Sequence, residues 1–262
     1  MTSRALDWLV CPVCEARLAR DGSVLRCAAG HSFDVARQGY VNLLRRAAPE
    51  NADTPAMVAA RDRFLRAGHY APIAAAVADV ARGARQIVEV GAGTGYYLAT
   101  ALDEVPEAEG LATDVSPAAA RRAARCHPRA AAVVADTWLR LPLPDGAVDA
   151  VLCVFAPRNA AEFARVLRPG GRAVVVVPGP AHLRELREGY GLLGVGEDKA
   201  ERVRQAFDGW GSREERLTYE LALGAEDVAD VISMGPNAFH GLPAATAPCR
   251  ATVDVAVLTL TR

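Results

Sequence analysis

The sequence predicts an α/β protein, in which a doubly wound parallel sheet follows a small N-terminal metal-binding module. Three observations support this fold class. An apolar run, Ile87 to Val90, ends in glycines at alternate positions. Further strand-like runs alternate with helical ones and end in acidic residues. Near the N-terminus, three cysteines and a histidine are spaced in two pairs.

Composition excludes several classes of protein. The chain has 262 residues, a net charge of −1 and about half apolar residues. No apolar run reaches the length of about 18 residues that a membrane span needs, and Met1 to Val10 lacks the apolar core of a signal peptide. We therefore expect a cytoplasmic protein, whose six cysteines are metal ligands or core thiols and not disulfides. The net charge does not indicate a strongly basic nucleic-acid binder.

The N-terminal module has the ligand spacing of a zinc site. Cys11, Cys14, Cys27 and His31 follow the pattern C-x2-C-x12-C-x3-H. Two pairs of ligands joined by a short hairpin, here turning at Asp21-Gly22, build a closed tetrahedral site. The alternative is a set of unconnected thiols. Because the protein would occupy all four positions, we expect the zinc to be structural.

The segment after the zinc ligands mixes aromatic and basic residues. Residues 33–46 combine Phe33 and Tyr40 with Arg37, Arg45 and Arg46, a mixture suited to phosphate contact and base stacking. Packing against the next domain explains the aromatics equally well. We divide the chain into a zinc-binding RNA-recognition module (1–46), a linker and helix (47–72) and a large domain (73–262).

The linker helix is a second candidate RNA surface. Thr54-Pro55 supplies an N-cap and a first-turn proline for a helix from Met57 to Ala67, which Gly68 ends. Its sequence carries three arginines, Arg61, Arg63 and Arg66. We expect these arginines and the zinc module to form the platform that binds RNA.

A glycine turn opens the large domain. Gly91, Gly93 and Gly95 follow a buried strand and precede a helix, as in nucleotide-binding α/β domains, where glycine lets a ligand approach the main chain. The spacing G-x-G-x-G differs from the dinucleotide motif, and no phosphate loop is present in the sequence. The alternative is a tight turn with no ligand. We count Glu89, in the strand, with Gly91 and Gly93 among the candidate cofactor contacts.

Polar residues end the next two strands. Asp114 closes the strand 110–114 and can accept both ribose hydroxyls of an adenosine ligand. An N-cap role for Asp114 is less favoured, because Ser116-Pro117 already supplies a cap. Asp136-Thr137 closes the strand 131–135 and can read an adenine amine. The remaining expected elements are a strand at 148–155, a helix at 159–167, a turn at 168–171 and a strand at 172–177.

This order of turn, acids and a Leu-Arg-Pro-Gly-Gly segment resembles the class I S-adenosylmethionine-dependent methyltransferases over residues 87–177. With the N-terminal part added, the chain resembles the RlmA family, bacterial guanine-N1 methyltransferases of 23S ribosomal RNA. The stretches that carry this second resemblance are the zinc pattern, Phe33-Asp34, Gly39 to Leu44, Ala67-Gly68-His69-Tyr70, Tyr96-Tyr97, Phe155-Ala156-Pro157 and Pro178 to Leu183.

The resemblance implies roles for residues that say little by themselves. It implies that the four N-terminal ligands hold zinc, and that Tyr70, Gly93, Thr94 and His182 contact S-adenosylmethionine, which leaves as S-adenosylhomocysteine. From the residues alone, Tyr70 reads as a packing residue and His182 as a surface residue. The resemblance assigns no catalytic residue, and no residue is identified as a general base. We expect the Phe155 segment to border the target base.

The resemblance also implies partners. It points to a 23S ribosomal RNA hairpin as substrate and to macrolide resistance, because DVARQGYVNLLRR at 34–46 looks like the tylosin-producer branch. A second copy of the chain is an open alternative as partner, and a membrane is not expected. Competing interpretations are a methyltransferase of a small molecule or protein, and a zinc-stapled RNA-binding homologue without activity. A nicotinamide dehydrogenase is disfavoured by the glycine spacing.

Overall fold

The computed structural model describes residues 4–196 and 198–262, so residues 1–3 of the predicted module and residue 197 of the predicted large domain lie outside the described residues. The zinc module contains a 3-10 helix, η1 (Arg4–Trp8), and a three-stranded antiparallel sheet. Its strands are β1 (Leu18–Asp21), β2 (Val24–Cys27) and β3 (Ser32–Asp34). The β1–β2 pair turns at Gly22, as predicted, with Asp21 opposite Val24.

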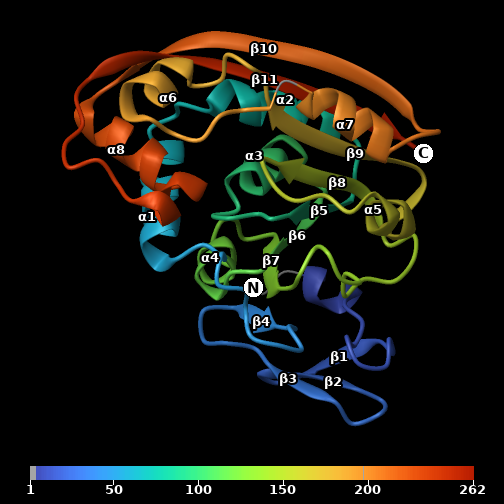
Figure 1. Cartoon of the computed structure of the whole chain (residues 1–262). Coiled ribbons are helices and arrows are strands. Elements are labelled where there is room, and N and C mark those ends of the chain that lie inside the picture. The colour runs from blue at the N-terminus through green and yellow to red at the C-terminus, as the bar shows by residue number, and fades with distance from the viewer. Residues whose placement is uncertain (1–3, 197) are drawn as a thin grey trace.

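An eight-stranded mixed sheet forms the centre of the molecule (Figure 1). The strand order is β10-β11-β9-β8-β5-β6-β7-β4. The strands are β4 (Tyr40–Asn42), β5 (Gln86–Val90), β6 (Glu109–Asp114), β7 (Ala130–Val134), β8 (Val148–Val154), β9 (Leu167–Pro178), β10 (Gly211–Leu223) and β11 (Cys249–Thr261). The five predicted strands are present, and these neighbours pair in parallel.

The sheet differs from the expected parallel one at its C-terminal end. The long strand β11 pairs antiparallel with β9, and β10 pairs antiparallel with β11. The predicted turn at 168–171 lies inside β9 as an irregularity: Leu167 pairs with Val148, whereas the next paired residue, Arg172, lies opposite Ala150. Gly170 in this excursion has a φ of +78°.

Helices cover both faces of the sheet, and each face has its own apolar core. One core includes residues of α1 (Pro55–Arg66), α2 (Ala71–Ala81), α3 (Tyr96–Glu104), α4 (Pro117–Ala123), α6 (Arg184–Tyr190) and α8 (Ala225–Ser233). The other includes residues of η1, α5 (Ala160–Val166) and α7 (Lys199–Ala206). A short 3-10 helix, η2 (Pro236–His240), follows α8.

Local signals account for the helix starts. Thr54 caps α1 by accepting a hydrogen bond from the Met57 N–H, with Pro55 in the first turn. Ser116 caps α4 in the same way, with Pro117 next. These caps satisfy N–H groups that a helix cannot satisfy itself. Asp114 is therefore not required as a cap.

The zinc module packs directly on the large sheet. Its buried residues Leu6, Leu18 and Leu25 share one core with Val88 and Leu111 of the central strands. Moreover, β4, which lies within the predicted 1–46 module, pairs in parallel with β7 at the edge of the large sheet. The boundary at residue 46 stays a prediction. Among the described residues, no helix combines the length and apolarity needed to cross a bilayer.

Candidate cofactor site and zinc centre

The glycine turn lies at the carboxyl end of β5 and tolerates no side chain at two of its positions. Gly91, Gly93 and Gly95 have φ values of +64°, +55° and +76°, which favour glycine. A Cβ on Gly91 would lie 2.5 Å from the Cβ of Ala156, and one on Gly95 would lie 2.8 Å from the Sγ of Cys126. The turn therefore brings the segment after β8 directly over the end of β5.

Two buried acids flank the turn. The Oδ2 of Asp114 accepts the Gly93 N–H at 2.8 Å, and its Oδ1 accepts the Ser116 N–H at 2.8 Å. The Oε2 of Glu89 accepts the Leu98 N–H in the first turn of α3 at 3.0 Å. Burial raises the pKa of Asp114, and burial raises the pKa of Glu89 to about 8 despite the hydrogen bond from Leu98. Ligand groups that donate hydrogen bonds or carry positive charge suit this site.

Tyr70 and His182 are 112 residues apart and meet in the structure. The Tyr70 hydroxyl lies 3.2 Å from Nε2 of His182, whose Nδ1 accepts the Asp254 N–H at 3.3 Å. A neutral imidazole has one N–H, so Nε2 carries it and donates to the Tyr70 oxygen. The ring of Phe155 stacks on His182 with centroids 5.6 Å apart and lies 5.9 Å from the ring of Tyr70.

An unpredicted buried acid, Asp254 of β11, holds the loop that carries His182. Its carboxylate accepts the Ala181 N–H at 3.0 Å and two N–H groups of Arg216 at 2.8 and 2.7 Å. A Cβ on Gly179 would lie 2.5 Å from this carboxylate, so only glycine fits there. A single acid within the apolar run 253–258 is the signal that sequence reasoning could have used.

The predicted adenine pair, Asp136 and Thr137, follows the carboxyl end of β7. Thr137 is buried, and its carbonyl accepts a hydrogen bond from Asn159 at 3.2 Å. Asp136 accepts the Trp138 N–H and pairs with Arg46 at 2.9 Å. The predicted cofactor residues thus lie at or just after the carboxyl ends of β5, β6, β7 and β9, with Tyr70 beside His182, and Asp136 already has a cationic partner.

The three arginines of α1 all have partners within the protein. Arg63 makes a two-pronged ion pair with Asp230 of α8, and Arg66 pairs with Asp62 at 3.1 Å. The guanidinium of Arg61 is turned toward the glycine turn. Each arginine thus has a partner within the protein, but the side chains of Arg63 and Arg66 are 64% and 69% exposed, and a contribution of α1 to an RNA platform stays a prediction.

The four zinc-binding candidates converge as the spacing predicted. Their ligand atoms all lie within 4.8 Å of one another. The Sγ atoms of Cys14 and Cys27 are 3.6 Å apart, and Nδ1 of His31 lies 3.3 and 3.6 Å from the Sγ atoms of Cys27 and Cys11. Four bonds of about 2.0–2.3 Å at tetrahedral angles place ligand atoms roughly 3.4–3.8 Å apart. The donor set therefore fits a closed, structural zinc ion.

The electrostatics of the cluster favour thiolate at Cys27, whereas burial and the neighbouring Cys27 and Cys11 raise the pKa of Cys14. Burial raises the pKa of Cys27, but hydrogen bonds from His31, Cys14 and the backbone lower it by more, to about 6. The Val13 N–H also points at the Sγ of Cys11, at 3.4 Å. A thiolate is the form that binds metal.

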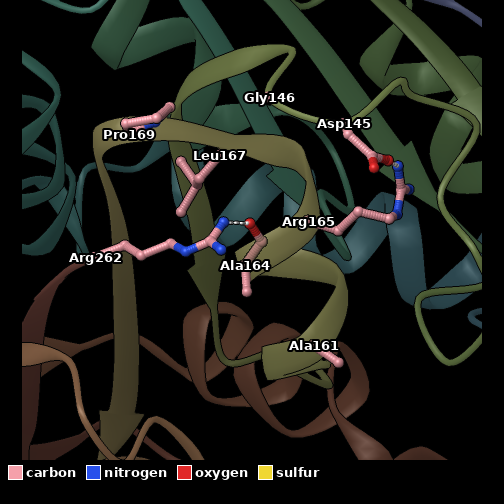
Figure 2. Close-up of a pocket in the computed structure, with 8 residues that line it drawn as sticks. All are labelled: Asp145, Gly146, Ala161, Ala164, Arg165, Leu167, Pro169 and Arg262. Carbon is pink, nitrogen blue, oxygen red and sulfur yellow. Dashed lines mark hydrogen bonds and ion pairs between the residues drawn. The ribbon is translucent and has the colours of Figure 1, made fainter.

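A cavity between α5, the start of β9 and the C-terminal Arg262 lies away from this site. It has a volume of about 580 Å³ and lies beside the starts of β8 and β9, at the opposite edge of the sheet (Figure 2). Arg262 reaches the Ala164 carbonyl there, and Arg165 pairs with Asp145. The charged groups that line this cavity are already paired with other protein groups. The cavity also lies at the amino ends of the strands, whereas ligands of parallel sheets bind at the carboxyl ends. We therefore assign it no role in the chemistry.

Comparison with known proteins agrees with this geometry. Residues 9–45 match the family model described as "RlmA, N-terminal", and residues 87–171 match that of a methyltransferase domain. A 23S rRNA (guanine(748)-N(1))-methyltransferase from Streptomyces fradiae is 47% identical over 93% of this chain and 90% of its own length. A protein from Micromonospora griseorubida, also described as a 23S rRNA (guanine-N(1)-)-methyltransferase, is 47% identical over 97% of this chain and 92% of its own.

A solved structure supports the fold. The complex between the Haloferax volcanii Trm112 methyltransferase activator and a methyltransferase contains a chain that matches with a TM-score of 0.51 and 20% identity, over 80% of this chain and 97% of that one. At this identity the likeness concerns the fold alone. Family model, sequence relatives and zinc cluster together place this chain in the RlmA-type family of 23S rRNA (guanine-N1)-methyltransferases.

Proposed function

We propose that this chain transfers a methyl group from S-adenosylmethionine to N1 of a guanine in a hairpin loop of 23S ribosomal RNA. The similarity to the Streptomyces fradiae enzyme spans both the zinc module and the large domain, which supports the same class of substrate. The observation in the structure that carries the proposal is the position of Phe155.

Phe155 is an aromatic residue at the mouth of the site. It follows β8 with a φ of +54°, a left-handed conformation that is costly for a bulky side chain. Its side chain is 39% exposed, one face stacks on His182, and the next residue, Ala156, lies over Gly91. An unstacked guanine could pack on its exposed face beside the glycine turn.

The site residues fit the proposed cofactor. S-adenosylmethionine, when bound, supplies a methyl group that the sulfonium makes electrophilic. The glycine turn offers a close approach to the main chain, and the buried acids offer acceptors for hydroxyl and ammonium groups. We propose as cofactor contacts Tyr70, Glu89, Gly91, Gly93, Thr94, Asp114, Asp136, Thr137 and His182. Their task is to align guanine N1 and keep water out, which supplies most of the rate in a direct displacement.

Tyr70 and His182 orient the bound ligand, and neither acts as the base that removes the guanine N1 proton. Burial lowers the pKa of His182 to about 4, so the ring is neutral and weakly basic at pH 7. Burial also raises the pKa of Tyr70 far above its ordinary value. With its oxygen accepting from His182, the Tyr70 O–H is left to donate to a bound ligand. Water takes up the proton that leaves guanine N1.

We place the RNA contacts on the zinc module and its neighbouring segment. Arg37 and Arg45 are exposed, and neither has an ion pair among the described residues. Trp138 lies close in sequence to Asp136, and its side chain is 64% exposed. Two residues further on, Arg140 forms an ion pair with Glu15 of the module at 3.1 Å. Exposed arginines neutralise phosphates and an exposed indole stacks on bases.

Matched arginine variants test this surface. Replacing Arg37 and Arg45 by glutamine should weaken RNA binding about tenfold or more and flatten its dependence on salt, because two phosphate contacts are lost. The pair Arg63→Gln and Arg66→Gln removes the same charge from α1 and should leave the salt slope unchanged. Filter binding at several salt concentrations measures both. A larger effect of the α1 pair would return the RNA platform to that helix.

A Phe155 series tests the substrate. Phe155→Ala should lower kcat/KM for the RNA by about 10- to 100-fold through lost stacking, with Phe155→Tyr close to the parent, while calorimetry shows unchanged binding of S-adenosylhomocysteine. Transfer to a small molecule or protein but not to RNA would favour the first competing function. Absence of cofactor binding by the parent protein would favour an inactive homologue.

We further propose that this methylation confers resistance to macrolides. It is supported by the likeness of residues 34–46 to the tylosin-producer branch. A susceptible strain that gains this protein should need several-fold more tylosin for growth arrest, and an unchanged requirement would restrict the function to RNA modification.

A further inference from the structure

Arg61 lies over the glycine turn, a contact that its position in α1 does not predict from the sequence. Its Nη1 is 3.0 Å from the point that a Cβ on Gly93 would occupy, and its side chain is 23% exposed. Gly93 itself adopts a left-handed φ and has its N–H bound to Asp114. A glycine here therefore makes room for a guanidinium beside the predicted cofactor contacts.

The guanidinium joins segments that are far apart in sequence. Nη1 pairs with the Asp53 carboxylate, and Nη2 donates to the carbonyl oxygen of Met234 after α8. Asp53 in turn accepts the Ser116 hydroxyl at its backbone oxygen, at 2.6 Å, and the Ser116 N–H binds Asp114. A short chain of polar contacts thus runs from Arg61 to the predicted ribose acid.

The charges on the two sides of the turn are complementary to an amino acid. Buried Glu89 lies at the end of β5 and can accept an ammonium group, whereas Arg61 offers a cation on the side of α1. A guanidinium has five N–H donors, of which the structure engages one on Nη1 and one on Nη2. Its planar fork matches a carboxylate better than any other cationic side chain does.

We propose that Arg61 binds the α-carboxylate of the methionyl part of the cofactor. Asp53 is the positioning residue that keeps the guanidinium over the turn. This assignment rests on the methyltransferase function proposed above. The competing explanation is that Arg61 only ties α1 to α8 and to the linker.

A pair of ligands separates these explanations. S-adenosylhomocysteine carries the carboxylate, and decarboxylated S-adenosylhomocysteine lacks it and is otherwise the same molecule, so calorimetric Kd values for both isolate the carboxylate. The parent protein should prefer S-adenosylhomocysteine to the decarboxylated ligand by about 10- to 100-fold, the range of a charge-assisted hydrogen bond pair. Arg61→Gln should lose that preference by weakening S-adenosylhomocysteine alone, and Arg61→Lys should restore part of it.

Controls make each outcome decisive. Arg63→Gln removes a neighbouring charge of α1 and should leave both Kd values unchanged. If Arg61→Gln weakens both ligands equally, or neither, the carboxylate role is wrong, and thermal unfolding of the variant shows whether a tie between helices was lost. If the parent protein binds neither ligand, the proposed function fails first and this inference with it.

Discussion

Glu89 and Asp114 are held by backbone N–H groups, and no cation of the described residues forms an ion pair with either. Such carboxylates are desolvated but only partly compensated, which explains why burial raises both pKa values. The energetic cost is typical of functional sites, where a later ligand supplies the missing partner. At the scale of single residues, this supports a cofactor role for both acids.

Glu89 gives a prediction for stability as a function of pH. Its pKa is 4.5 in an ordinary environment and about 8 in the folded chain. Below the ordinary value the carboxyl is neutral in both states; as the pH rises to about 8, only the unfolded chain gives up its proton, so stability falls. Glu89→Gln keeps an acceptor for the Leu98 N–H and removes this titration.

Urea unfolding at about pH 5 and about pH 9 checks the prediction. The stability of the parent relative to Glu89→Gln should fall over this range, by roughly 5 kcal/mol at most. A difference between the two proteins that stays constant with pH would show that Glu89 is ionised throughout.

The residues of the site were predictable to different degrees. The zinc ligands follow from spacing alone, because a closed tetrahedral site imposes it. Tyr70 and His182 were predicted as cofactor contacts only through the family resemblance, because no local sequence pattern predicts a contact between residues 112 positions apart. The contacts of Arg61 were not predictable for the same reason: a helix periodicity shows which residues are polar, but not which distant acid or turn each one contacts.

For elements with a strong local sequence signal, the predicted boundaries agree with the observed ones to within a few residues. The apolar runs of β5 to β8 and the capped starts of α1 and α4 illustrate this, because strands buried on both faces and Ser/Thr-Pro caps leave clear patterns. The strands β10 and β11 were not anticipated. Most residues of β10 are exposed and β11 contains a buried acid, so neither segment has the continuous apolar pattern of a buried strand. Their antiparallel pairing depends on contacts at the edge of the sheet, which the sequence does not show.

The element that positions His182 is the loop between β9 and α6, and β11 holds it in place. Asp254→Asn should destabilise the fold by about 1–3 kcal/mol and weaken cofactor binding, because the buried carboxylate bonds two arginine N–H groups and the Ala181 N–H. Arg216→Gln is the matched control: its side chain is largely exposed, so its loss should cost less, about 1 kcal/mol or below.

Denaturant unfolding and calorimetry with S-adenosylhomocysteine measure both effects. Equal losses of stability and affinity in the two variants would show that the ion pair, and not the clamp on the loop, carries the energy.

For the whole molecule, the zinc module is an extension of the large sheet's core. Its leucines pack with those of the central strands, and Val10 donates to the Pro142 carbonyl at 3.0 Å. The cofactor candidates, however, lie between residues 70 and 182, outside this module. Metal binding and cofactor binding should therefore be separable, although the two parts touch.

Removal of zinc tests that separation. A chelator should unfold the β1–β3 sheet, because a segment this small depends on its metal, and RNA affinity should fall at least tenfold. The Kd for S-adenosylhomocysteine should change by no more than about threefold. Zinc analysis, RNA binding and calorimetry on the same stripped protein provide the comparison. Loss of cofactor binding together with zinc would contradict the separation.

Mapping the methylated nucleotide tests the proposed reaction. Protein-free 23S ribosomal RNA is incubated with this protein and isotopically labelled S-adenosylmethionine, digested, and mapped by mass spectrometry. We expect one added methyl group, on N1 of a single guanine in a hairpin loop, and about 10- to 100-fold slower labelling with the Phe155→Ala variant. Label on another atom, on no nucleotide, or on a small molecule instead would contradict it.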